Sequence, residues 1–203
     1  MSAIELFGQA YIERNKPTRD THFARVDMFS RILAHCDHGP SSILEVGANV
    51  GNNIQVLNEI SGARLYATEP NLEARCQLVQ SGYLRSVDIS GNPAGAMTDF
   101  ADNSIDLVFT SGVLIHLNPE FDLKPAMQEI LRVARRYVLA IEYFSDKPEM
   151  IIYRGEPDRL WKRDFGKLYL ESFPKLMPIA QGFEWRETTG LDNLTWWLFR
   201  KDV

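Results

Sequence analysis

The sequence has little cysteine, no long apolar run and no excess of positive charge, and each absence excludes a class of protein. Cys36 and Cys76 are too few for a disulfide framework or a metal cluster, so we expect reduced thiols and no metal. No apolar run approaches the ~20 residues that span a bilayer, and the first residues lack the apolar core of a signal peptide. The net charge of -5 argues against a nucleic-acid-binding surface. We therefore expect a cytoplasmic protein whose partner is a small molecule rather than a membrane or a nucleic acid.

The composition is that of an ordinary globular protein. Of the 203 residues, 45% are hydrophobic and 24% are charged. This length suits one domain, 1–203, with a sizeable core. It leaves open whether the protein is a monomer or a homodimer.

A stretch around residue 47 combines a short apolar strand, a glycine turn and a helix. The strand covers 43–47, and the apolar spacing from Ile54 onward is helical. Gly47 and Gly51 bracket the turn, which places a backbone without Cβ atoms and a helix N-terminus against one ligand. Glu45 repels phosphates and suits a cationic or hydroxyl-bearing ligand. The pyrophosphate fingerprint G-x-G-x-x-G is absent as well.

A second acid, Glu69, ends the next predicted strand, 64–69. It lies 18 residues beyond Gly51 (69 − 51 = 18). An acid about 20 residues past such a turn accepts hydrogen bonds from the ribose hydroxyls of an adenosine. The turn and Glu69 together predict an adenosine-type ligand.

Strands and helices alternate along most of the chain. We predict further strands over 84–89, within 103–119, and over 137–144, 178–186 and 194–200, and helices over 22–35, 52–61, 73–82, 121–136 and 167–173. This alternation predicts an α/β fold with a mostly parallel sheet.

Two of these stretches resemble motifs of the class I S-adenosylmethionine (SAM)-dependent methyltransferases. Residues 41–53 resemble motif I, with Asn49 where the family usually has its middle glycine, and residues 103–119 resemble motif IV. The resemblance implies a Rossmann-like fold with a seven-stranded sheet of order 3-2-1-4-5-7-6 and helices on both faces. It implies SAM as cofactor and S-adenosylhomocysteine as product. The alternative is a purely structural turn in another doubly wound protein.

The resemblance also implies which residues contact SAM. They lie in the leading segment, the glycine turn and the ends of the second, third and fourth strands: Tyr11, Glu45, Gly47, Ala48, Asn49, Gly51, Asn52, Glu69, Pro70, Asp88, Ile89, Thr110, Ser111, Gly112 and Val113. In this family an acid at the position of Asp88 accepts from the adenine amino group. Asp88 could instead cap a turn before Gly91.

Two segments outside the motifs have two interpretations each. Residues 1–40 are predicted to be helical and either form a lid that brings Tyr11 and Arg14 over the ligand or simply pack on the domain edge. Residues 145–166 are an insertion after the fifth strand, predicted as neither a regular helix nor a strand. They either bind an anionic substrate or form a solvated loop with local ion pairs. The candidate substrate-binding residues are Arg14, Tyr153, Arg154, Arg159, Lys162 and Arg163.

Methyl transfer from SAM needs few side chains, because the sulfonium makes the methyl group electrophilic and the enzyme mainly aligns the nucleophile. A hydroxyl nucleophile would need a general base, for which His116 is the first candidate and Glu142 and Tyr143 are alternatives. A carboxylate nucleophile would need none. His116 could equally be a structural residue that holds its loop.

A closer similarity covers nearly the whole chain. Residues 11–15, 113–119, 153–155 and 162–165 are similar to methylases associated with pseudaminic acid biosynthesis. This implies a methyltransferase that acts at oxygen or nitrogen of a small anionic molecule, such as a nonulosonate or a related sugar or acid. Two alternatives stay open: an enzyme that cyclises SAM and releases methylthioadenosine, and a non-catalytic SAM-binding accessory protein.

Overall fold

The computed structural model describes residues 18–153 and 155–202. Seven strands form the central sheet, in the order β3-β2-β1-β4-β5-β9-β8. Their bounds are Ser42–Val46 (β1), Arg64–Thr68 (β2), Ile89–Ser90 (β3), Ile105–Ser111 (β4), Ala134–Glu142 (β5), Leu176–Glu184 (β8) and Leu194–Lys201 (β9). Strands β3, β2, β1, β4 and β5 pair in parallel, and β9 is antiparallel to both neighbours. The predicted α/β class is confirmed, and the order matches the prediction once β6 and β7, which form a separate sheet, are left out.

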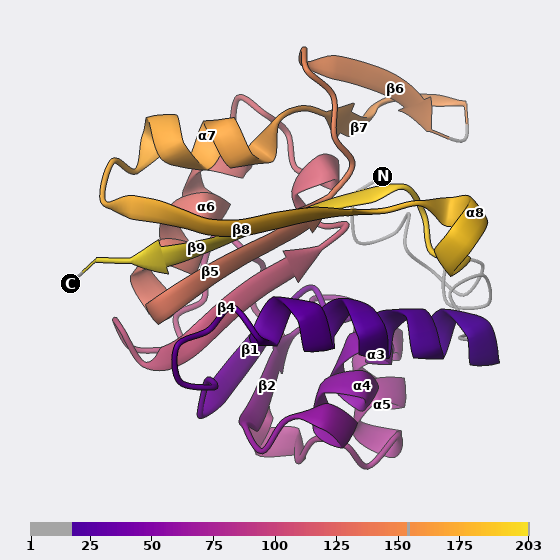
Figure 1. Ribbon diagram of the computed structural model, residues 1–203, viewed down its shortest axis with the longest axis vertical. Coiled ribbons are helices and arrows are strands. Elements are labelled where there is room, and N and C mark those ends of the chain that lie inside the picture. Colours follow the sequence, from indigo (N-terminus) through magenta and orange to yellow (C-terminus); the bar gives the residue numbers. More distant parts are fainter. Residues whose placement is uncertain (1–17, 154, 203) are drawn as a thin grey trace.

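Helices cover both faces of this sheet (Figure 1). Helices α3 (Arg19–Leu33), α4 (Asn52–Ile60) and α5 (Leu72–Gln80) pack on one face, and α6 (Leu123–Val133) and α7 (Phe165–Ser172) pack on the other. Helix α6 shows why, since its buried residues Leu123, Met127 and Ile130 recur every three or four positions and form one apolar stripe. Helix α8 (Arg186–Thr189) is a single turn before β9.

Helix α3 begins three residues before the predicted start. The side chain of Thr18 accepts a hydrogen bond from the Thr21 backbone N–H, and the Thr21 hydroxyl bonds back to the Thr18 N–H, which forms a capping box. These reciprocal bonds satisfy free donors of the first turn and set the boundary.

The predicted third strand, 84–89, is mostly wrong. Only Ile89–Ser90 pairs with β2, and the short helix η1 (Ser86–Asp88) precedes it. The carboxylate of Asp88 accepts hydrogen bonds from Arg85 at 2.8 Å and from Arg64 at 2.7 Å. The Arg85 bond spans three residues and suits a helical turn better than an extended strand.

The insertion after β5 is a β-hairpin rather than an irregular loop. Strands β6 (Glu149–Tyr153) and β7 (Glu156–Lys162) pair antiparallel and form a sheet of their own, with Gly155 at φ 80° in the turn. Leu160 is buried in the core on the α6 side, where Ile151 and Tyr153 pack with it. The hairpin lies outside the main sheet, at the end toward which β4 points (Figure 1).

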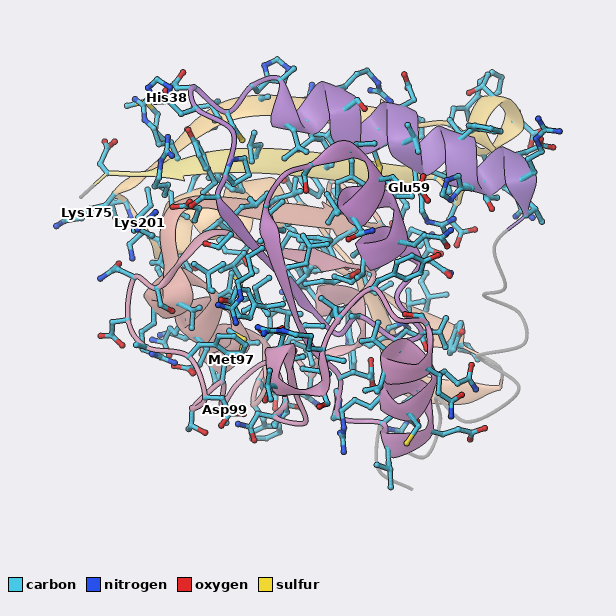
Figure 2. All side chains as sticks on the ribbon, turned by 90° about the horizontal axis from the view of Figure 1, so that it is seen from below. His38, Glu59, Met97, Asp99, Lys175 and Lys201 are labelled. Atoms are coloured by element: carbon cyan, nitrogen blue, oxygen red, sulfur yellow. The ribbon has the colours of Figure 1, made fainter. Side chains whose placement is uncertain are left out.

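At the end of the sheet opposite the hairpin, the last residue of β9 is bonded to the junction between α6 and β5. The Nζ of Lys201 donates to the backbone oxygens of Leu131 and Ala134, at 2.8 and 2.9 Å, where α6 passes into β5. Lys201 and Lys175 lie at the same end of the molecule (Figure 2). Within 18–153 and 155–202, no helix is long and apolar enough to cross a membrane.

Candidate functional site

The glycine turn lies between β1 and α4 and is tied to the end of β2. Gly47, Asn49 and Gly51 all have left-handed backbones, with φ of 75°, 50° and 89°. The backbone N–H groups of Gly47 and Ala48 donate to the carbonyl oxygen of Thr68, at 2.8 and 2.9 Å. The turn therefore lies at the carboxyl end of β1, next to the point between β1 and β4 where the strand order reverses, the usual ligand position in such sheets.

The two glycines of the turn are needed for packing as well as for conformation. A Cβ on Gly47 would lie 2.7 Å from Cγ2 of Val113, and a Cβ on Gly51 would lie 2.4 Å from Cδ1 of Leu78. Gly51 thus allows α5 to approach the turn, whereas the sequence predicted that it allows a ligand to approach.

Glu69 lies directly after β2 and connects the end of this strand with the glycine turn and with the start of α5. Its Oε2 accepts from the Asn49 N–H at 2.7 Å, and its Oε1 accepts from the Asn71 N–H at 2.8 Å. Burial raises the pKa of this carboxyl, while the two backbone N–H groups and Arg75 oppose that rise. Pro70 follows it, and Arg75 donates to the Pro70 carbonyl oxygen at 3.2 Å.

Glu45 is fully enclosed on the last part of β1. Its Oε1 accepts from the side-chain amide of Asn53 at 2.7 Å, and Oε2 is buried with no hydrogen-bond partner among the described residues. Burial raises the pKa of Glu45 to about 8, against the influence of Asn53 and the nearby charge of Arg25. A buried polar oxygen without a hydrogen-bond partner is costly in a folded protein, so Oε2 is a candidate contact for a ligand.

Arg25 on α3 is a residue that the sequence interpretation missed. Burial lowers the pKa of its guanidinium, while the charges of Glu45 and Asp192 oppose this. Its Nη1 donates to the Thr21 carbonyl oxygen at 3.2 Å. Nothing in the local sequence of α3 distinguishes Arg25 from a surface arginine, because its surroundings come from the far segments that carry Glu45 and Asp192.

Asp88 lies outside the strand near whose end it was predicted. It precedes β3, and both its carboxylate oxygens bind arginines, Arg64 and Arg85. The residue after the carboxyl end of β3 that offers a comparable acceptor is Asn92. Its amide nitrogen donates to Thr98 and to Asp99, at 3.0 Å each, which fixes the orientation of the amide.

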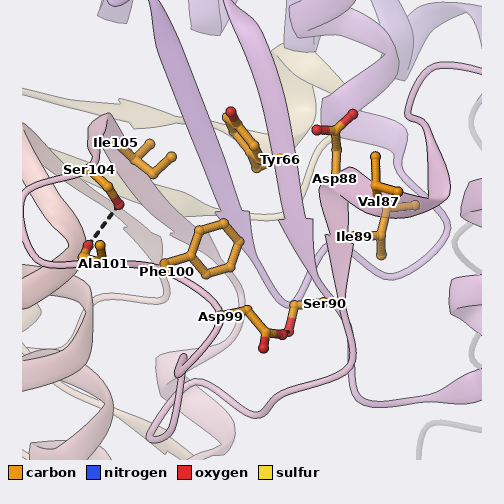
Figure 3. A pocket seen from close by; sticks show the side chains of 10 residues that line it. All are labelled: Tyr66, Val87, Asp88, Ile89, Ser90, Asp99, Phe100, Ala101, Ser104 and Ile105. Carbon is orange, nitrogen blue, oxygen red and sulfur yellow. Dashed lines mark hydrogen bonds between the residues drawn. The ribbon is translucent and has the colours of Figure 1, made fainter.

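A cavity of about 330 Å³ lies beside this loop, on the sheet rather than over the glycine turn. Tyr66 and Phe100 both line it, with their rings edge to face and their centroids 6.0 Å apart, and Ser90 and Asp99 lie at its lower end (Figure 3). Ile89 and Asp88 also line it, whereas Gly47, Gly51 and Glu69 do not. We therefore take the strand ends, and not this cavity, as the candidate site.

The segment after β4 is held by Glu142, the last residue of β5. The fully buried carboxylate accepts from the backbone N–H groups of Val113, Leu114 and Ile115, at 3.2, 3.1 and 3.4 Å. Burial raises the pKa of Glu142 to about 7, opposed by these N–H groups and by Thr110. In this position the carboxylate is occupied by backbone donors, and a general base would have to reach the proton of the acceptor as well, so the role of Glu142 as a base stays a prediction.

His116 ends the short helix η2 (Leu114–His116) and contacts the hairpin. Its Nδ1 lies 2.8 Å from the carbonyl oxygen of Arg159, and its ring centroid lies 5.5 Å from that of Tyr153. Burial lowers the pKa of His116, which favours the neutral imidazole. The contact with Arg159 supports the structural role considered from the sequence, and it does not test a role as a base.

The remaining predicted site residues that the structure describes lie at the end of β5, in or next to β7, and at the ends of α4 and β4. The Tyr143 hydroxyl donates to Asp192 at 2.6 Å, and Lys162 Nζ lies 5.4 Å from the Tyr143 ring centroid. The Nε of Arg163 is buried with no hydrogen-bond partner among the described residues, and burial lowers the pKa of this guanidinium. Asn52 begins α4, Ser111 ends β4, and Gly112 follows it. Tyr11, Arg14 and Arg154 lie outside the described residues.

Comparisons with known proteins agree with this architecture. A family described as a methyltransferase domain matches residues 44–140, slightly less than half of the chain. None of the curated proteins matches the sequence.

Several solved structures share the fold at low sequence identity. The 1,6-didemethyltoxoflavin-N1-methyltransferase of Burkholderia thailandensis, solved with 1,6-didemethyltoxoflavin and S-adenosylhomocysteine, is 19% identical with a TM-score of 0.75, over 99% of this chain and 87% of that one. Magnesium protoporphyrin IX methyltransferase of Synechocystis, solved with SAM, is 11% identical with a TM-score of 0.70, over 100% and 98%. The [4+2]-cyclase SpnF is 15% identical with a TM-score of 0.63, over 87% and 82%. The predicted fold is thus confirmed: the chain has the fold of these methyltransferase structures, and residues 44–140 match a methyltransferase domain family.

Proposed function

We propose that this protein binds SAM across the carboxyl ends of β1, β2 and β4 and transfers its methyl group to a small anionic molecule. The observation that carries this proposal is the arrangement of Glu69 and the glycine turn. A carboxylate bonded to the turn's own Asn49 N–H lies at the strand-order reversal, where it can accept from ribose hydroxyls.

The residues present fit SAM along its whole length. Glu69 would hold the ribose, and Asn92 would accept from the adenine amino group in place of Asp88. Glu45 Oε2, which lacks a donor among the described residues, suits the ammonium group of the methionine end. The guanidinium of Arg25, close enough to Glu45 to influence its pKa, suits the carboxylate.

The acceptor would bind beneath the β6–β7 hairpin. The hairpin meets the exit of β4 through His116, so it covers the side of the site next to β4 and β5. Arg163 supports an anionic acceptor, because its buried Nε has no partner among the described residues. Lys162 adds a second cation on the side of Tyr143. A nonulosonate or a related sugar or acid has the required negative charge.

The protein's part in the reaction is alignment and water exclusion. SAM when bound supplies an electrophilic methyl group, so the chain must place an oxygen or nitrogen nucleophile in line with it. The apolar and aromatic residues of the hairpin would exclude water from that nucleophile. A hydroxyl acceptor requires a base, for which neutral His116 remains the candidate, and a carboxylate acceptor requires none.

The test is product analysis with the purified protein. We would incubate it with SAM and a panel of sugar acids, nonulosonates included, and identify the adenosyl by-product and any methylated acceptor by mass. We expect S-adenosylhomocysteine and one methylated acid. Methylthioadenosine without an acceptor would show cyclisation of SAM instead, and tight SAM binding without turnover on the panel would favour an accessory protein.

A further inference from the structure

Glu142 has a bonding pattern that catalysis by a general base would not require. One carboxylate accepts from three successive backbone N–H groups, those of Val113, Leu114 and Ile115. These donors include N–H groups at the start of helix η2 that lack partners within the helix. Burying a charge is costly, and three N–H donors offset part of that cost.

The segment bonded to Glu142 contacts both the glycine turn and the hairpin. On one side the Val113 side chain packs against Gly47 so closely that a Cβ there would lie 2.7 Å from Cγ2. On the other side His116 bonds to the Arg159 carbonyl oxygen of β7 at 2.8 Å. Residues 112–116 therefore bridge the glycine turn and the hairpin, and a shift of this bridge would move one relative to the other.

We propose that Glu142 is a positioning residue, which fixes the bridge 112–116 so that the hairpin and the glycine turn keep the spacing needed for in-line transfer. This inference rests on the proposed function for its catalytic consequence. Its structural part, the anchoring of the bridge, stands independently.

The negative charge is part of this role. Both oxygens of a carboxylate accept, whereas an amide would turn its NH₂ group toward N–H donors. Burial raises the pKa of Glu142 to about 7. The neighbouring groups that interact with it are Thr110 of β4 and the buried hydroxyl of Tyr169 on α7, whose pKa rises through burial and the charge of Glu142. Protonation of Glu142 below about pH 7 would weaken the anchor.

The test compares Glu142→Gln with Glu184→Gln as a matched control. Glu184 is also a buried carboxylate that ends a strand of the same sheet, but it bonds to Arg31 and Trp196, away from the glycine turn and the hairpin. Hydrogen exchange followed by mass spectrometry is measured on both. We expect amides 113–116 and the hairpin to exchange at least about tenfold faster in Glu142→Gln and to be unchanged in Glu184→Gln. Equal exchange of the bridge in the wild type and Glu142→Gln would overturn the proposal.

The kinetic readout separates positioning from general stability. We expect Glu142→Gln to lower kcat at least about tenfold with less than about a threefold change in the Kd for S-adenosylhomocysteine, and to remove a wild-type decline in kcat below about pH 7. Equal losses of kcat in both folded variants would overturn the positioning role. A wild-type protein that neither binds S-adenosylhomocysteine nor turns over would defeat the proposed function, while the exchange experiment would still decide the anchoring.

Discussion

The carboxylate of Glu69 and the backbone N–H of Asn49 are joined by a hydrogen bond of 2.7 Å that ties the end of β2 to the middle of the glycine turn. If Glu69 also accepts from the ribose, Glu69→Ala removes both interactions. We expect a loss of ~1.5–3 kcal/mol in the binding free energy of S-adenosylhomocysteine, which is about 10- to 150-fold in Kd. Calorimetry measures it, with Glu73→Ala on the exposed start of α5 as control. Equal affinities of the two variants would contradict the ribose assignment.

Arg25 is predicted to bind the carboxylate of the SAM methionine end. Arg25→Gln removes a charge-assisted hydrogen bond, so we expect at least about a tenfold weaker Kd for S-adenosylhomocysteine. Methylthioadenosine has no amino-acid end and provides the matched ligand. Its Kd should change less than about twofold in the same variant. A parallel loss for both ligands would show that Arg25 acts through the fold.

Arg163 is predicted to bind the anionic acceptor. Arg163→Gln should raise the acceptor KM at least about tenfold and leave the Kd for SAM within about twofold, because the side chain lies on the hairpin side of the site. Lys167→Gln, an exposed cation four residues further on, serves as control. Loss of SAM binding with an unchanged acceptor KM would assign Arg163 to the cofactor.

Gly51 is predicted to matter for stability through Leu78. Gly82 has a similar positive φ, 77° against 89°, but no atom lies within 4 Å of an added Cβ. Gly82→Ala should therefore cost only the backbone strain, about 1 kcal/mol. Gly51→Ala should lower the free energy of unfolding by at least about 1 kcal/mol more, because the buried Leu78 cannot move away freely. Urea denaturation measures both, and equal losses would refute the close contact.

Glu45 is predicted to make stability fall as pH rises. Its pKa is about 8 in the folded protein and near 4.5 in the unfolded chain, so between these values the folded state binds more protons. Relative to Glu45→Gln, the wild type should lose about 2–4 kcal/mol of unfolding free energy from about pH 5 to about pH 8.5. A constant difference between the two proteins over this range would show that Glu45 is ionised throughout, stabilised by Arg25.

The sequence predicted the parts of this protein whose signals are local. The apolar strand before Gly47, the turn and the acid at Glu69 lie within one strand–helix–strand unit, and the structure has that unit as expected. The closing strand pair was predicted for the same reason. The spacing of apolar residues, every second residue in a strand and every third or fourth in a helix, depends only on the local segment. It can therefore be read without knowing the rest of the fold.

The sequence did not show those contacts of the site that depend on distant partners. Asp88 ends an apparent strand in the sequence, yet Arg64 and Arg85 occupy its carboxylate. Arg25 interacts with Glu45, and Glu142 accepts hydrogen bonds from the backbone of residues 113–115. Both pairs are far apart in the sequence and meet only in the folded chain. The sequence predicted neither a helix nor a strand for the hairpin, because its charged residues obscure the alternation that Leu160 and Ile151 follow.

Because β6 and β7 pair only with each other among the described strands, their length is not tied to the register of the seven-stranded sheet. An insertion or deletion at the Gly155 turn would lengthen or shorten the ribbon without shifting any of the larger sheet's pairings. If the hairpin binds the acceptor as proposed, acceptor preference can change through the hairpin without a change in the strand pairing of the larger sheet. On the same condition, the hairpin is the segment to exchange when the acceptor range is to be redesigned.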